Sequence, residues 1–291
     1  MHLDCCVTES DRRWDFALDQ PGSASPATLR YSAGFAAIII AATVATVAFR
    51  HLQLAVFPQF ATFHAGFILV VDGIAAFLLF GQFAYRPLAF YALLGAAYLF
   101  NALVVIPFLL SFPGGLKAES VVIGGSQSAI WVWHAWHIVF PIMVGLSLLA
   151  HERTTSRPVP AARVVPYIGW MVATAVVLAS LVTLAVSVFH DHLPVLITPA
   201  RVPHTSTFYA VGGTAAALTA FSLVLSLRGV RRRSVLHIWI AVALLAFLGD
   251  VVASLDESAS GLDVLKVPPG FLGEPALLLL EFLPPAALHA Q

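Results

Sequence analysis

The stretch Ser126–Ala150, SQSAIWVWHAWHIVFPIMVGLSLLA, decides the fold. It contains no acidic residue, no Lys and no Arg, and as a helix rising about 1.5 Å per residue it is long enough to cross about 30 Å of hydrocarbon. Three tryptophans, two histidines and a proline nevertheless lie within it. Because ionisable side chains in membrane helices are costly and usually face the bundle interior, this stretch is also the first candidate for a functional site.

Composition places the whole chain in the membrane class. Hydrophobic residues make up 59% of the sequence and charged residues 10%, and the mean hydropathy is +0.89. The sequence lacks strand-like alternation, so we predict an all-α polytopic transmembrane helical bundle rather than a barrel. Seven apolar runs without Lys or Arg are long enough to span: 33–49, 64–83, 88–110, 126–150, 166–189, 207–227 and 235–254.

The distribution of basic residues predicts the orientation, because cytoplasmic loops are enriched in Lys and Arg. With a cytoplasmic N-terminus, only Arg50, Lys117, Arg201 and Lys266 lie outside. The other 11 of the 15 basic residues then lie inside: Arg12, Arg13, Arg30, Arg86, Arg153, Arg157, Arg163, Arg228, Arg231, Arg232 and Arg233. We therefore predict a multi-pass membrane protein with its N-terminus in the cytoplasm. The basic 228–233 turn is interpreted as an inside anchor and not as a nucleic-acid site.

Depth along the helices predicts which polar side chains meet. Counted from the outer ends of their spans, Asp72 and His134 lie about 12 Å deep, Asn101 about 14 Å and His137 about 16 Å. Trp133 and Trp136 lie in the same part of the fourth span, and Pro141 removes a hydrogen bond to the carbonyl of His137 and favours a bend. We therefore expect one polar layer shared by the second, third and fourth spans, with these seven residues as candidates for sensing a signal or ligand.

Three interpretations of this layer stay open. The residues could hydrogen-bond as contacts between helices, worth about 1 kcal/mol or less each. They could form a pocket in which a small ligand, a proton or a redox-active lipid alters those bonds, with a His–Asp pair that titrates. A metal or haem site is the third, less favoured, interpretation, because a complementary inward histidine for haem is missing. The cofactor is thus unknown.

Other polar residues of the spans are assigned simpler roles. Asp250, near the outer end of the seventh run, is expected to reach toward water, and His64 is expected at the outer rim of the second. His237 and Trp239 are expected in an interfacial belt, as are Trp170 and Tyr167. His190 and His192 are interpreted as part of a solvated outer loop.

The motifs that the sequence lacks narrow the possible classes of function. It has no Gly-rich phosphate loop, no Cys-x-x-Cys pair and no nucleophile elbow, so an enzyme is not expected. The leading interpretation is a membrane sensor that passes a helix displacement to a partner in the cytoplasm. The alternative is a small-molecule or proton-coupled transporter, although no repeat relates 33–150 to 166–254. The lipid bilayer is the one partner that composition requires, and oligomerisation stays open.

Several short motifs in order resemble one family. They are Asp72 with the run Ala76–Gln82, AFLLFGQ; Tyr98-Leu-Phe; the segment 107–114 ending Ser-Phe-Pro-Gly; and Trp131, Trp133, Trp136, His137 with Phe140-Pro141. Over about 30–254 the chain resembles MASE4, a membrane-associated sensor domain of bacteria. The resemblance implies an input module of the bacterial inner (cytoplasmic) membrane, commonly with about eight spans and fused to a cytoplasmic diguanylate cyclase or histidine kinase output.

The resemblance divides the chain into three parts. Residues 1–32 are predicted to be a cytosolic tail, 33–254 the MASE4-like sensor domain and 255–291 a divergent Pro-rich tail. The stretch 271–283 is short for a crossing and contains Glu274, Pro275 and Glu281, which makes it a doubtful eighth span. We expect the last span of the family plan to be degraded, truncated or replaced here, leaving a sensor without its own output domain.

Overall fold

Seven long helices make up the computed structural model, which describes residues 24–49, 60–113, 115–116, 120–154, 158–196, 205–231 and 234–260. They are α2 (Pro26–Ala48), α3 (Phe60–Tyr85), α4 (Ala89–Ser111), α5 (Ser128–Thr154), α6 (Val164–Ser187), α7 (Ser206–Arg231) and α8 (Val235–Ser260). Short 3-10 turns occupy Ala161–Arg163 and His190–His192. All seven helices are long and apolar enough to cross a membrane, which confirms the predicted fold class for the described residues.

Most helix boundaries follow the apolar runs, but two differ in a way that matters. α2 begins at Pro26, ahead of the predicted start at residue 33, because Ser25 caps it: its Oγ accepts a hydrogen bond of 3.1 Å from the amide of Thr28. α8 continues to Ser260, past the predicted end at residue 254. The predicted last span and tail, beyond residue 260, lie outside the described residues.

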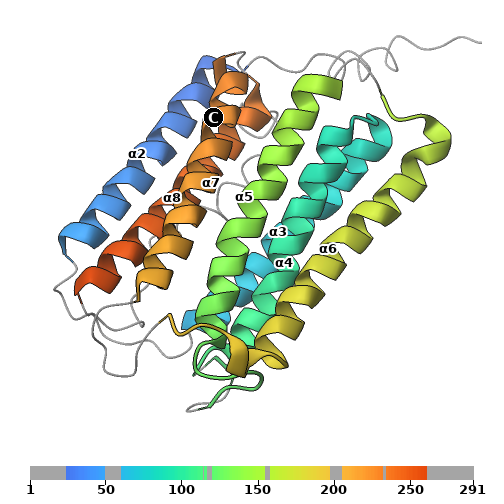
Figure 1. Cartoon of the computed structure of the whole chain (residues 1–291). Helices are drawn as coiled ribbons and strands as arrows, with labels where there is room; N and C mark the ends of the chain where they lie inside the picture. The colour runs from blue at the N-terminus through green and yellow to red at the C-terminus, as the bar shows by residue number, and fades with distance from the viewer. Residues whose placement is uncertain are drawn as a thin grey trace, which may run out of the picture.

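The helices pack as two groups (Figure 1). In the first, called here the four-helix group, α4 lies against α3, α5 and α6. In the second, the three-helix group, α8 lies between α2 and α7. The groups meet mainly where α5 packs against α7, with few further contacts between α5 and α8. We call this boundary the seam.

Burial follows the same division. The middle of α4 is buried on nearly all sides, and Leu94, Phe100 and Val104 have no exposed surface. By contrast α2 and α6 at the two edges bury little of their length, so their apolar side chains are placed to face lipid. The polar residues discussed below therefore lie between helices, where the chain can supply hydrogen-bond partners.

Small and hydroxyl side chains hold the seam close. The hydroxyl of Ser222 on α7 donates a hydrogen bond of 2.8 Å to the carbonyl of Pro141 on α5. One turn further along α5, a Cβ added to Gly145 would stand 2.7 Å from the Oγ of Ser222, too close for an ordinary contact. Glycine at 145 thus allows α5 and α7 to approach at this point.

Candidate functional site

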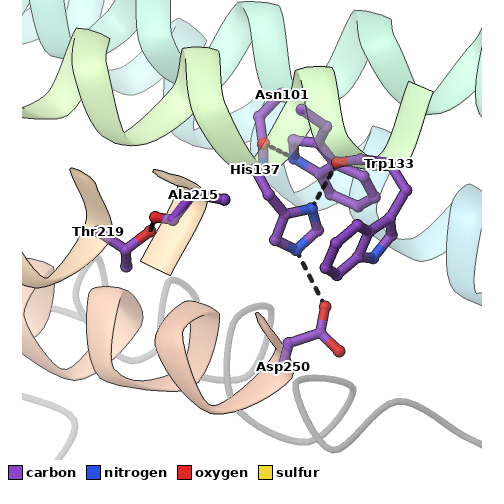
Figure 2. A network of polar contacts seen from close by, with 7 residues as sticks. Asn101, Trp133, His137, Ala215, Thr219 and Asp250 are labelled. Carbon is purple, nitrogen blue, oxygen red and sulfur yellow. Dashed lines mark hydrogen bonds and ion pairs between the residues drawn. The ribbon is translucent and has the colours of Figure 1, made fainter. Parts of the chain in front are cut away.

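Neighbouring residues of α5 face different helix groups. Successive side chains of a helix are turned by about 100°, so Trp136 and His137 cannot point the same way. The indole of Trp136 bonds to Asn101 of α4 within the four-helix group. His137 points across the seam to Asp250 of α8 (Figure 2). The predicted polar layer is therefore divided into two separate contacts.

The first contact lies inside the four-helix group and joins α3, α4 and α5. The Nε1–H of Trp136 donates to Oδ1 of Asn101, and Nδ2 of Asn101 donates to Oδ2 of Asp72 at 2.5 Å. Asp72, Asn101 and Trp136 are 3%, 1% and 4% exposed. The structure thus brings together three of the predicted site residues, from the three helices expected.

The second contact crosses the seam and centres on His137. Its Nδ1 lies 2.8 Å from the carbonyl oxygen of Trp133, one turn earlier on α5. Its Nε2 lies 3.0 Å from Oδ2 of Asp250 on α8 (Figure 2). The imidazole is stacked between Trp133, at a centroid distance of 4.0 Å, and Phe247, at 4.2 Å. A buried His–carboxylate pair between flat aromatic walls is the main chemical feature of the seam.

Two predictions about these residues are wrong. Asp250 does not reach toward water: it is 9% exposed and bonded to His137. The carboxylate that pairs with His137 is consequently Asp250 and not Asp72, which accepts a hydrogen bond from Asn101. The error follows from the end of α8, because a helix that continues to Ser260 places Asp250 about 15 Å from its outer end, level with His137.

His134 and Pro141 also take part in the seam. The Nδ1 of His134 lies 2.8 Å from the carbonyl of Ile130, and its buried ring meets the ring of Phe208 on α7 edge-on at 5.1 Å. Through this ring contact His134 lies against α7 at the seam. α5 continues through Pro141 to Thr154, and the carbonyl of Pro141 accepts the hydrogen bond of Ser222.

Sequence reasoning overlooked two further histidine environments. His64 of α3 interacts electrostatically with Asp250 and with His137, which places it beside the seam and not only at the outer rim. His237 and Trp239 of α8 are 5% and 6% exposed and pack inside the bundle. The ring of His237 stacks on Phe90 of α4, with centroids 5.6 Å apart.

Three other residues named from the sequence lie on or near the surface of the bundle. Trp170 is 72% exposed on α6, while Tyr167 is half-buried and its ring lies against Phe83. Within the described ranges, no group of three or more His, Cys, Asp or Glu residues could hold a metal ion. His190 and Asp191 form a pair at the surface, 3.2 Å apart.

Comparison with known proteins identifies the class of this bundle. Residues 55–261, which include α3 to α8, match the family model of MASE4, described as a membrane-associated sensor, integral membrane domain. No curated protein and no solved structure matched in the same comparisons. The matched range contains both polar contacts and the seam, whereas α2 precedes it. The chain belongs to the MASE4 family of membrane-associated sensor domains.

Proposed function

We propose that this integral membrane sensor module receives a signal within the bundle and passes it to a separate cytoplasmic signalling protein of the diguanylate cyclase or histidine kinase type. In this proposal the chain has no catalytic role of its own and lies in a bacterial cytoplasmic membrane with its N-terminus inside. The family match supports a sensory role, and the seam supplies the element that could respond.

The orientation is supported by the basic residues of the helices. Because consecutive long helices run in alternating directions, Arg30, Arg86, Arg163, Arg228 and Arg231 all lie at the same end of the bundle. Lys and Arg are enriched on the cytoplasmic side of membrane proteins. This end is therefore assigned to the cytoplasm, and the contact between His137 and Asp250 to the outer half of the seam.

The proposal is supported above all by the bond between His137 and Asp250, which joins two helix groups whose main packing contact is that of α5 with α7. A sensor needs an element with two arrangements whose balance the signal changes. Asp72, Asn101 and Trp136 hold α5 within the four-helix group, while Trp133, His134 and Pro141 shape its seam face. A signal that alters the His137 contact would thus move α8 and its neighbours α2 and α7.

The test uses the full chain in the bacterium that carries its gene. A deletion strain is complemented with wild type, with Asp250→Asn or with His190→Ala, and cellular cyclic di-GMP and response-regulator phosphorylation are measured. We expect deletion to change one of these outputs and Asp250→Asn to lock the output at one level. His190→Ala, at an exposed pair away from the seam, should restore wild-type output.

Two results would contradict the proposal. One is that neither output changes on deletion. The other is that the purified chain in proteoliposomes carries a substrate or proton flux that Asp72→Asn abolishes, which would identify a transporter. Membrane amounts of each variant are compared by immunoblot, so that loss of protein is not mistaken for loss of signal.

A further inference from the structure

We propose that the seam is a proton-binding site: one proton held between His137 and Asp250 joins the two helix groups, and its loss separates them. The first step concerns the imidazole. Nδ1 of His137 lies 2.8 Å from the carbonyl oxygen of Trp133, and a carbonyl can only accept. Nδ1 must therefore carry a hydrogen, which leaves Nε2 as the only nitrogen whose protonation can vary.

The second step concerns the contact with Asp250. Nε2 and Oδ2 are 3.0 Å apart, a distance that requires one hydrogen between them. That hydrogen belongs either to an imidazolium facing a carboxylate or to a carboxylic acid facing a neutral imidazole. Both forms are neutral overall and hold the same number of protons. The hydrogen bond between His137 and Asp250 therefore exists only while this one proton is bound.

Removing that proton would make the contact repulsive. A neutral imidazole with its hydrogen on Nδ1 would turn the Nε2 lone pair toward an ionised Asp250. His137 is 1% exposed, and Oδ1 of Asp250 is buried with no hydrogen-bond partner among the described residues. Among the described residues no hydrogen-bond donor reaches this oxygen, and a buried unpaired charge is costly. Separation of α8 from α5 would let solvent or lipid headgroups reach it.

The walls of the site favour the bound state. Trp133 and Phe247 present their ring faces to the two sides of the imidazole, inclined by 24° and 26°. Aromatic faces attract a cation, so they stabilise the imidazolium form of His137. The same walls exclude water from the bond, which couples loss of the proton to a change in packing.

Few other titratable groups face this pair. His64 of α3 interacts electrostatically with both partners, and His134 lies one turn away on α5. α7 contributes Tyr209 near its outer end and arginines at its inner end, and α2 has Arg30 and Tyr31 at the inner end. On α4, Tyr98 packs on Phe140, and Asp72 of α3 is held by Asn101. None of these is an acid bonded to His137, which makes Asp250 the residue to test.

The number of protons bound by the His137–Asp250 pair determines how the seam responds to pH. At low pH the proton is bound and the two helix groups are joined. Raising the pH removes the proton and separates the two helix groups. The proposal rests on the proposed function only for its role in signalling, because the separation itself can be measured without any partner protein.

The experiment measures distances between spin labels on the full chain in lipid nanodiscs, with Cys5 and Cys6 changed to Ser. Labels at Val188→Cys on the end of α6 and Val252→Cys on α8 report on the two groups, since both side chains are exposed. Labels at Phe63→Cys and Val188→Cys lie within the four-helix group and serve as the control pair. Distances are recorded from about pH 5 to about pH 10, the range that covers imidazole and buried carboxyl titration.

We expect the distance across the seam to lengthen as pH rises, with the slope of a single-proton titration, while the control distance stays constant. Asp250→Asn should keep the short distance at every pH, because its amide donates to Nε2 without titrating. His137→Phe should abolish the titration while keeping the aromatic stack. Asp72→Asn should titrate like wild type, because Asp72 lies within one group.

The proposal is overturned if the wild-type seam distance does not change with pH, or if Asp250→Asn titrates as wild type does. A seam that titrates in nanodiscs, together with no signalling phenotype in cells, would instead contradict the proposed function and leave the proton site standing. The two failures are therefore distinguishable.

Discussion

The two polar contacts of the bundle have similar chemistry but connect different parts of the structure. Asp72, Asn101 and Trp136 connect helices that α4 already holds together, so their hydrogen bonds satisfy buried groups within one packed unit. His137 and Asp250 connect two units that touch along one boundary. A buried bond inside a unit contributes stability, whereas a bond across a boundary also sets the arrangement of the units. This difference assigns the sensing role to the seam.

The largest effect is expected from His137→Ala, which removes the contact across the seam. The change leaves Asp250 buried without its partner and removes the ring between Trp133 and Phe247. Breaking a buried pair by removing one partner costs about 3–5 kcal/mol. Denaturant or thermal unfolding in detergent micelles measures the loss. His190→Ala, at a partly exposed pair outside the seam, should cost less than His137→Ala does, and an equal loss in both variants would contradict the role assigned to His137.

A smaller effect is expected from Asn101→Ala inside the four-helix group. The substitution removes the shared partner of Asp72 and Trp136 and leaves both without the bonds described. An unsatisfied buried polar group costs about 1–3 kcal/mol. The same unfolding assay should show this loss, while the spin-label distance across the seam should keep its wild-type response to pH. A change in that response would mean that the two contacts are not separate.

The close approach of α5 and α7 gives a matched pair of glycine substitutions. In Gly145→Ala the new methyl group meets the Oγ of Ser222, so α7 must shift or Ser222 must release the carbonyl of Pro141. Overpacking of this kind costs about 1–3 kcal/mol. Gly73→Ala on α3 adds a methyl group with no atom within 4 Å and should be neutral or slightly stabilising. Equal stability of the two variants would show that the seam is loosely packed.

The sequence was sufficient to predict the helices and the first of the two polar contacts. Long apolar runs predict spans because only a helix satisfies its own backbone in lipid, and depth along three consecutive spans correctly joined Asp72 to Asn101. The partner of His137 was missed for a local reason. Asp256 and Glu257 made the seventh run look complete at residue 254, whereas α8 continues to Ser260 and places Asp250 deeper.

The sequence also did not show in which direction each side chain points around the axis of α5. Trp136 and His137 are adjacent in sequence, and depth alone puts them in one layer, yet their polar atoms bond to different helix groups. Which group lies on which side depends on the packing of α7 and α8 against α5, and those contacts join residues far apart in the chain. For example, Ser222 meets Pro141 across 81 positions. Short motifs within one helix do not contain that information.

The most direct test of the account is a double-mutant cycle on the free energy of unfolding, with His137→Phe, Asp250→Leu and the double variant, set beside the same cycle for His137→Phe and Asp72→Leu. The account predicts that the His137 and Asp250 substitutions are coupled, with an interaction energy of about 0.5–3 kcal/mol, and that those at His137 and Asp72 are additive within about 0.5 kcal/mol. Coupling of His137 to Asp72, with none to Asp250, would contradict the seam contact on which the proposed sensor rests.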